Sequence, residues 1–129
     1  LSQLLGAKLC RGADLILDEI GIDTHLSQCD IVITGEGRID RQTPDGKLPA
    51  GIAKRAKKIG KTVFAICGSE ERNVQEALYT AGIDEVISCV ATPCTLQEAM
   101  EQAQDNVIRA AQRLMRIIEA SCKIGGNIQ

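Results

Sequence analysis

The residues best suited to chemistry lie in the segment from Gly35 to Lys47. Three carboxylates and three cations occur within it: Glu36, Asp40, Asp45, Arg38, Arg41 and Lys47. Glycines within the segment permit close approach of backbone to a ligand. Such a mixed-charge loop suits an anionic ligand together with a bound cation. The alternative is a polar surface turn whose charges pair with one another, for example Glu36 with Arg38.

The two commonest phosphate-binding motifs do not fit this segment. A P-loop would require glycine and Ser or Thr at positions where Arg41 and Leu48 stand. The dinucleotide fingerprint G-x-G-x-x-G starts with Gly35 and Gly37 but then meets Asp40. The sequence therefore supports neither a Walker-type NTPase nor a Rossmann dehydrogenase.

Short apolar and β-branched runs predict the elements that position this loop. Three runs are typical of strands buried on both faces: 31–33, 62–67 and 85–90. Helical patterns over about 49–61 and 74–81 separate them, so the chain reads as two βαβ units and a parallel sheet. Ligands of such sheets bind beyond the carboxyl ends of the strands. The charged loop follows the first strand and is long for a βα connection, which favours function.

The helices carry their own signals. In the first, Ile52, Ala56 and Ile59 form the expected apolar stripe, and its four cations (Lys54, Arg55, Lys57 and Lys58) are interpreted as a solvated face rather than a ligand patch. Gly82 ends the second helix. A capping box at 95–98 opens a long helix to about residue 120.

Two turns or caps are also predicted. The segment 43–46 (Thr-Pro-Asp-Gly) fits a type I turn. The first 28 residues look helical, with Asp23 or Thr24 capping a short helix. His25, the only histidine, is interpreted as surface polarity rather than a catalytic base.

Composition narrows the function classes. Phe64 and Tyr79 are the only aromatic residues and the net charge is −2, which argues against nucleic-acid binding. No run approaches the length of a membrane-spanning helix, and no signal peptide is evident. The six cysteines include no C-x-x-C pair, which favours structural free thiols and a cytoplasmic location over a metal or redox role.

The predicted sheet is thin. Three parallel strands leave two exposed edges, which natural folds avoid, and the chain begins with Leu1 rather than Met. We therefore expect an α/β fold with a parallel, Rossmann-like three-layer sheet that is incomplete. Residues 1–129 would form the C-terminal part of a larger doubly wound domain and end in a long helix.

The charged loop belongs to a longer pattern. The run 30–40 (D-I-V-I-T-G-E-G-R-I-D) is followed by Gln42-Thr43, Gly46-Lys47, Pro49, Gly51, Ala53 and Ala56-Lys57. This pattern resembles the signature stretch of bacterial glycerate kinases. The runs 63–68 and 81–84 and the final helix resemble the C-terminal region of the same family. The resemblance covers nearly all of this chain but about the last third of a typical member.

The resemblance implies an ATP-dependent kinase of two α/β domains that phosphorylates a hydroxyl of D-glycerate, most often to 2-phosphoglycerate. The resemblance implies ATP and Mg²⁺ as cofactors and D-glycerate and ATP as the small-molecule partners. A homodimer is one quaternary structure that it allows. A fragment without the upstream elements is expected to be inactive.

Site roles follow as hypotheses, because phosphoryl transfer depends on positioning and charge neutralisation. Asp40, Lys47 and Glu36 are the predicted catalytic residues, and Asp40 and Glu36 are the candidate Mg²⁺ ligands, with the base and metal roles undivided. Lys47 and Arg38 would contact phosphate or the glycerate carboxylate. The full predicted set of substrate- and phosphate-binding residues is Gly35, Gly37, Arg38, Gln42, Thr43 and Gly46.

Two alternatives remain open at this level. The first is a truncated, non-catalytic nucleotide- or anion-binding module with the same fold. The second is an oligomerising α/β domain whose loop mediates protein contacts. A sugar isomerase on a similar sheet would need a histidine or metal set that the sequence does not show.

Overall fold

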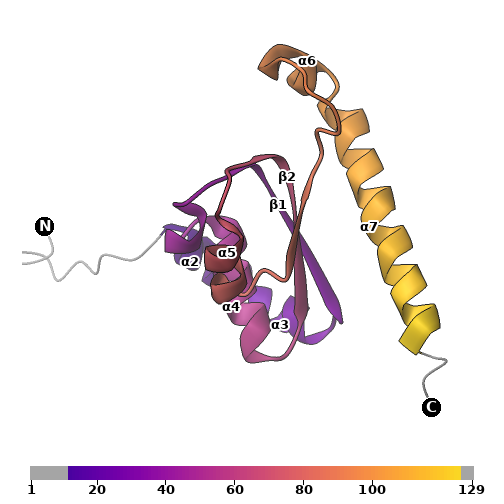
Figure 1. Ribbon diagram of the computed structural model, residues 1–129. Helices are drawn as coiled ribbons and strands as arrows, with labels where there is room; N and C mark the ends of the chain where they lie inside the picture. The colour runs from indigo at the N-terminus through magenta and orange to yellow at the C-terminus, as the bar shows by residue number, and fades with distance from the viewer. Residues whose placement is uncertain (1–11, 126–129) are drawn as a thin grey trace, which may run out of the picture.

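A three-stranded parallel sheet forms the centre of the molecule. The computed structural model describes residues 12–125, and within them the strands β1 (Ile31–Ile39), β2 (Thr62–Glu70) and β3 (Glu85–Ser88) pair in the order β1-β2-β3. The helical elements are α2 (Gly12–Glu19), α3 (Ile22–Ser27), η1 (Thr43–Asp45), α4 (Leu48–Lys58), α5 (Gln75–Ala81), α6 (Leu96–Glu101) and α7 (Ala103–Gly125). The predicted parallel α/β fold with a long final helix is confirmed (Figure 1).

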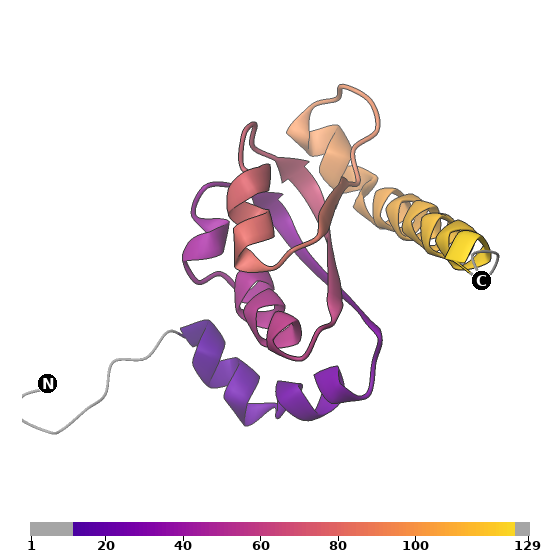
Figure 2. The ribbon, with the colours of Figure 1, turned by 60° about the horizontal axis from the view of Figure 1, so that its bottom comes forward.

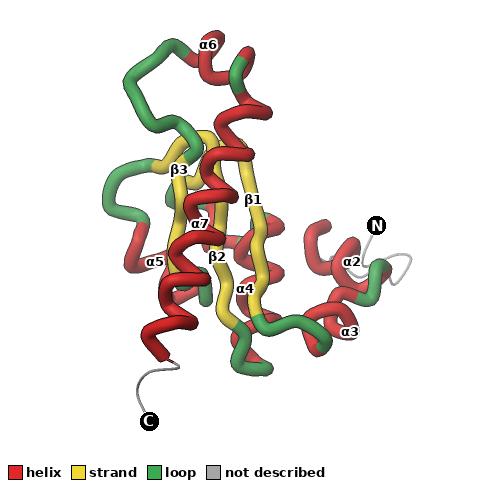
Figure 3. The backbone as a smooth tube through the Cα atoms, turned by 90° about the vertical axis from the view of Figure 1, so that its right-hand side faces the viewer, coloured by secondary structure: helices red, strands yellow, loops and turns green. Residues whose placement is uncertain are grey.

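Helices cover both faces of the sheet. Helices α4 and α5 lie on one face, while α7 crosses the other and packs on β2 and β3 (Figures 1 and 3). Helices α2 and α3 lie beside α4 and contact it (Figure 2). The described residues therefore form three layers, as the sequence predicted.

The core lies between the sheet and the α4 side. Ala50, Ala53 and Ala56 of α4 are fully buried, but Ile59 is 48% exposed, so the predicted stripe of Ile52, Ala56 and Ile59 was only partly right. Small side chains let the helix approach the neighbouring backbone closely. An added Cβ at Gly82 would lie 3.1 Å from the Ala53 carbonyl oxygen.

Burial alternates along the strands, which corrects the prediction of strands buried on both faces. In β2, Val63, Ala65 and Cys67 are buried while the residues between them are partly exposed. In β1, Ile33 is 48% exposed. The reason is that the inner face meets a continuous layer of helices, whereas α7 covers only part of the outer face.

Two thiols are buried, and that of Cys67 belongs to the core on this inner face. Cys67 and Cys89 are 1% and 7% exposed, as expected for cysteines that act as small hydrophobes. Burial raises the pKa of the Cys67 thiol to about 12 and also raises the pKa of Cys89. Neither thiol is therefore ionised at neutral pH.

Several predicted boundaries shift. Strand β1 continues through Gly35 and Gly37 to Ile39, so the loop begins at Asp40 rather than at Gly35. Strand β2 extends to Glu70, β3 ends at Ser88, and α4 ends at Lys58. Parallel pairing with β2 explains the longer β1, because the ladder continues to the pair Ile39–Glu70.

The helix signals were partly right. The capping box of Thr95 and Glu98 is present, but it opens the short α6. The helix is interrupted at Gln102, and α7 begins after it. Gly82 ends α5 with a φ of 99°, as predicted. Helix α3 starts after Gly21, so Asp23 and Thr24 lie inside it and cap nothing. Of the predicted N-terminal helical segment, residues 1–11 lie outside the described residues.

Candidate functional site

Strand alternation sends Glu36 toward the α4 layer. Glu36 pairs in register with Cys67, whose side chain is buried on that face. Side chains alternate along a strand and paired residues share a face. Glu36 therefore stands at the carboxyl end of β1 on the side from which α4 begins.

The turn after β1 fixes Asp40. The Thr43 amide donates to the Asp40 carbonyl oxygen at 3.0 Å, and the Asp40 amide donates to Thr43 Oγ1 at 3.1 Å. The Gln42 amide donates to Asp40 Oδ1 at 3.0 Å. Thr43 is fully buried, so its side chain closes the turn. The predicted type I turn at 43–46 is instead the 3₁₀ helix η1, which Gly46 ends with a φ of 123°.

Lys47 joins the two carboxylates. It occupies the position before the first residue of α4, and its ammonium lies 3.1 Å from both Asp40 oxygens and 3.3 Å from Glu36 Oε1. The side chains of Lys47, Glu36 and Asp40 are 29%, 26% and 23% exposed. We call these three residues the Glu36–Asp40–Lys47 cluster.

The cluster keeps its charges. The hydrogen bond from Lys47 holds the pKa of Asp40 below 3.8, while Asp40 and then Glu36 raise the pKa of Lys47 above 10.5. Asp40 is therefore an ionised acceptor and Lys47 an ammonium at neutral pH. An acid with a lowered pKa is a poor proton acceptor, so Asp40 is better suited to orienting a hydroxyl than to removing its proton.

One oxygen of the cluster lacks a partner. Glu36 Oε2 is buried and has no hydrogen-bond partner among the described residues. Both Asp40 oxygens, by contrast, accept from Lys47, and Oδ1 also accepts from the Gln42 amide. A buried carboxylate oxygen without a partner is costly and marks a position where a donor or cation would be stabilised. Glu36 is therefore the better placed of the two candidate metal ligands.

The remaining predicted residues serve different purposes. Gly35 and Gly37 lie within β1, where Gly37 faces Gly68 so closely that a Cβ on Gly68 would lie 2.7 Å from the Gly37 carbonyl oxygen. Arg38 is exposed and does not form the pair with Glu36 that the alternative of a polar surface turn would have, because the partner of Glu36 is Lys47. Its guanidinium is thus available at the end of the same strand.

A further ion pair supports the turn and was missed from the sequence. Arg41 Nε lies 2.6 Å from Glu71 Oε1, and the Glu71 amide donates to the Ile39 carbonyl oxygen at 2.9 Å. This pair ties the loop after β1 to the loop after β2. The only available signal was that Glu71 directly follows an apolar strand, because parallel strands end at one edge.

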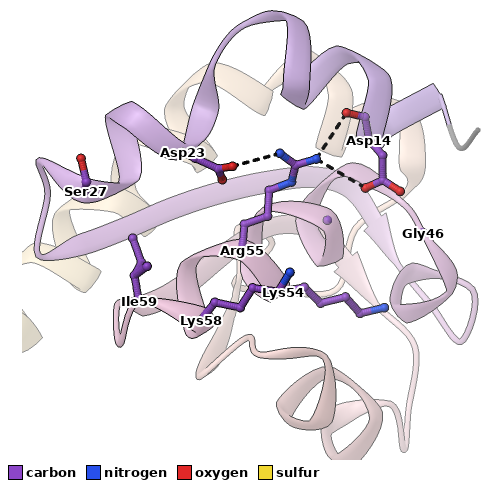
Figure 4. Close-up of a pocket in the computed structure, with 9 residues that line it drawn as sticks. Asp14, Asp23, Ser27, Gly46, Lys54, Arg55, Lys58 and Ile59 are labelled. Atoms are coloured by element: carbon purple, nitrogen blue, oxygen red, sulfur yellow. Dashed lines mark hydrogen bonds and ion pairs between the residues drawn. The ribbon is translucent and has the colours of Figure 1, made fainter.

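A separate cavity of about 640 Å³ lies between α4 and the α2–α3 pair. Arg55, with 17% of its side chain exposed, lines this cavity and pairs with Asp14 and Asp23 (Figure 4). The same guanidinium also pairs with Asp18. The sequence predicted a solvated face here, and Arg55 corrects that prediction. Because aspartates surround this guanidinium, the cavity is not a ready anion site, and Arg55 instead fixes α4 against α2 and α3.

Two kinds of feature are absent from residues 12–125. These residues contain no group of three or more His, Cys, Asp or Glu side chains placed to hold a metal ion. Within the same part of the chain, no helix has both the length and the apolar character that crossing a membrane requires.

Comparison with known proteins places the chain in a family. The profile of the "Glycerate kinase family" matches residues 1–119. The chain is 41% identical to "Glycerate 2-kinase" of Escherichia coli K12 over 97% of the chain and 32% of that protein, and 41% identical to "Glycerate kinase" of Bacillus cereus over 88% and 30%.

A solved structure agrees with the sequence comparison. A crystal structure assigned to glycerate kinase 2 of Salmonella typhimurium LT2 superposes with a TM-score of 0.71 at 38% identity, covering 95% of this chain and 31% of that one. The chain thus spans about a third of the length of the relatives that it matches. On the match over residues 1–119, it belongs to the glycerate kinase family.

Proposed function

We propose that this chain supplies part of the phosphoryl-transfer site of an ATP-dependent glycerate kinase, with D-glycerate as acceptor and 2-phosphoglycerate as product. The observation that carries the proposal is the Glu36–Asp40–Lys47 cluster at the carboxyl end of β1, in a chain of the glycerate kinase family. The name "Glycerate 2-kinase" of the Escherichia coli relative supports the product. The cytoplasm is the compartment that this substrate and the free cysteines favour.

The residues divide the work by charge. Phosphoryl transfer needs little covalent help from the protein and depends on positioning and charge neutralisation. Lys47 supplies a permanent cation, and the exposed Arg38 supplies a guanidinium that can hold a phosphate or carboxylate with two parallel hydrogen bonds. Asp40, fixed by the turn and by Lys47, accepts a hydrogen bond from the acceptor hydroxyl and orients it.

A magnesium ion fits this arrangement at Glu36. Mg²⁺ is bound through one or two carboxylates together with substrate phosphates, and Glu36 Oε2 is a buried carboxylate oxygen without a partner among the described residues. When bound, the ion would neutralise charge on the phosphates. Lys47 occupies the space between Glu36 and Asp40, so we assign the metal role to Glu36 and the hydroxyl-orienting role to Asp40.

A non-catalytic nucleotide- or anion-binding module is the second candidate. It would use only the ammonium of Lys47 and the exposed guanidinium of Arg38 as anion contacts, without a phosphoryl-transfer step. The isolated chain is expected to lack kinase activity under either proposal. Calorimetry of the chain with Mg-ATP and with D-glycerate measures whether it binds either ligand alone.

A chimera separates the two candidates. In it, this chain replaces the matching segment of the Escherichia coli relative, and ADP formation that depends on D-glycerate is measured. We expect an active chimera, a fall in kcat of about 100-fold or more for Lys47→Ala and Asp40→Asn, and little change for the matched control Lys58→Ala on the exposed side of α4. Near-normal turnover in both cluster variants would remove the cluster from the mechanism. A folded but inactive chimera that still binds Mg-ATP would favour the non-catalytic module.

A further inference from the structure

A second pocket lies at the same edge of the sheet, beyond β3. It has a volume of about 200 Å³ and is formed by the loop 90–94, by Glu98 and Gln102, and by Asn106 and Arg109 of α7. Strands β1, β2 and β3 are parallel, so this pocket and the Glu36–Asp40–Lys47 cluster both lie at carboxyl ends of strands. In open α/β sheets this edge is where ligands bind.

The pocket has a fixed cation. Arg109 pairs with no carboxylate among the described residues, and its guanidinium Nη2 donates to Asn106 Oδ1. Asn106 is only 6% exposed, the one amide side chain buried in the described part of the chain. A buried amide that accepts from an otherwise exposed arginine restricts that arginine to one orientation.

Asn106 also offers a donor. Its Oδ1 accepts from Arg109, and its Nδ2 group has no acceptor among the described residues. The amide nitrogen is not among the fully buried atoms without a partner, so it keeps some exposure to solvent, and Asn106 is one of the residues that line the pocket. The pocket therefore presents a guanidinium and an amide N–H group side by side, a combination that binds a carboxylate or phosphoryl group.

The opposite wall sets the size and polarity of the ligand. Glu98 is the one acidic side chain of the pocket, and its Oε2 accepts from the amide and hydroxyl of Thr95. One carboxylate in this position disfavours a ligand of high negative charge. A volume of about 200 Å³ is also below the usual range for drug-sized ligands, roughly 300–1,000 Å³.

We propose that the pocket of Asn106 and Arg109 binds the carboxylate or phosphoryl group of a small anion. The choice of D-glycerate and ATP as candidate sources rests on the proposed function, whereas the pocket itself does not. Arg109 and Asn106 hold the anionic group, and Glu98 accepts from a hydroxyl group where the ligand carries one. The site would be separate from the cluster at β1.

Nuclear magnetic resonance of the chain tests this directly and needs no activity. The side-chain amide of Asn106 and Nε of Arg109 are followed during titration with acetate, D-glycerate, inorganic phosphate and ATP without metal. Saturable shifts with acetate and glycerate identify a carboxylate site, and shifts with phosphate and ATP identify a phosphoryl site. Because acetate and phosphate are not kinase substrates, the site can be present even where the proposed kinase function fails.

Matched variants decide whether the shifts come from this pocket. Arg109→Gln should weaken binding at least about tenfold, and Asn106→Asp, which keeps the shape but adds a negative charge, should abolish it. Glu98→Gln retains an acceptor for Thr95 and should tighten binding of anions. Arg113→Gln, one turn further along α7 and outside the pocket, should change nothing. The absence of saturable shifts with all four probes, or equal affinity in wild type and Arg109→Gln, would overturn the proposal.

Discussion

At the scale of single residues, Lys47 is the group on which the candidate site depends. It neutralises two carboxylates that come from the end of β1 and from the turn after it. Without it, Glu36 and Asp40 would stand close together with no shared cation. The arrangement thus holds negative charge at the sheet edge only because one ammonium is placed between the two acids.

Substitution of Lys47 by Met should change the titration of Asp40. The hydrogen bond from Lys47 is the main cause of the lowered pKa of Asp40, so Lys47→Met should raise that pKa toward or above 3.8. A carbon-detected titration of the Asp40 carboxyl measures it. Lys58→Met, on the exposed side of α4, is the matched control and should leave the Asp40 pKa unchanged. An unchanged value in Lys47→Met would mean that the ion pair does not form in solution.

The same pair gives a pH dependence of stability. Because folding lowers the pKa of Asp40, its contribution is present above 3.8 and is lost as the pH falls through the folded value. Asp40→Asn should therefore lower the urea midpoint at neutral pH, and its difference from wild type should shrink below pH 3.8. For Lys47 the pKa is raised, so the Lys47→Met difference should shrink above pH 10.5. A difference that stays constant across this range would contradict the assignment.

The sequence predicted which charged residues gather at this edge of the sheet better than how they pair. Glu36, Asp40 and Lys47 were all predicted as site residues, because they lie in the charged segment at the carboxyl end of a strand of the parallel sheet. Which charges pair depends on where α4 begins relative to the end of β1. Because Lys47 directly precedes α4, Lys47 rather than Arg38 lies beside Glu36. Thr43 Oγ1 also accepts from the Asp40 amide and closes a turn, a contact that only the local backbone path reveals. Substrate binding by Thr43 stays a prediction.

At the scale of elements, the contact between β1 and β2 has a built-in requirement for glycine. A Cβ on Gly68 would lie 2.7 Å from the Gly37 carbonyl oxygen, whereas a Cβ on Gly37 would meet nothing within 4 Å. This asymmetry within one strand pair provides a natural matched experiment. The position matters for function because Gly37 directly follows Glu36 in β1.

Gly68→Ala should destabilise the chain by about 1–3 kcal/mol, the usual cost of forcing an extra methyl group into a packed contact. Gly37→Ala should change stability by no more than about 0.5 kcal/mol. Urea unfolding followed by circular dichroism measures both. Equal midpoints for the two variants would show that β1 and β2 separate at this point more easily than the structure indicates.

Element type was predictable where the pattern was local, and boundaries were not. The capping box at Thr95 and the glycine stop at Gly82 were both correct, because each depends on a few neighbouring residues. The length of β1 was underestimated because glycines were taken as loop residues, whereas pairing with β2 keeps them extended. The interruption between α6 and α7 at Gln102 could not be predicted, because no glycine or proline stands there.

At the scale of the whole molecule, one edge of the sheet gathers the chemistry. The Glu36–Asp40–Lys47 cluster lies at the end of β1, and the pocket of Asn106 and Arg109 lies beyond the end of β3. The two sites use helices from opposite faces of the sheet. Lys47 directly precedes α4 on one face, and Asn106 and Arg109 belong to α7 on the other. A ligand with two anionic ends could contact the exposed guanidinium of Arg38 at the end of β1 and that of Arg109 beyond the end of β3.

The outer surface of α7 carries apolar side chains that the described part of the chain does not cover. Ile108 and Met115 are 47% and 45% exposed, and their spacing of seven residues places them on one side of the helix. Ile33 on the same face of the sheet is 48% exposed. Removing such surface from water is favourable, so the isolated chain should self-associate as its concentration rises.

Sedimentation velocity over a concentration series tests this expectation. The wild-type chain should show a sedimentation coefficient that increases with concentration, and the double variant Ile108→Glu with Met115→Glu should sediment as a monomer throughout. Lys58→Glu changes the net charge by the same amount at an exposed position of α4, on the other face of the sheet, so it should behave like wild type. If the double variant associates as strongly as wild type, the contact must lie elsewhere. The outer edge of β1, which pairs with no strand of residues 12–125, would then be the next surface to alter, since it presents backbone groups that can pair with another strand.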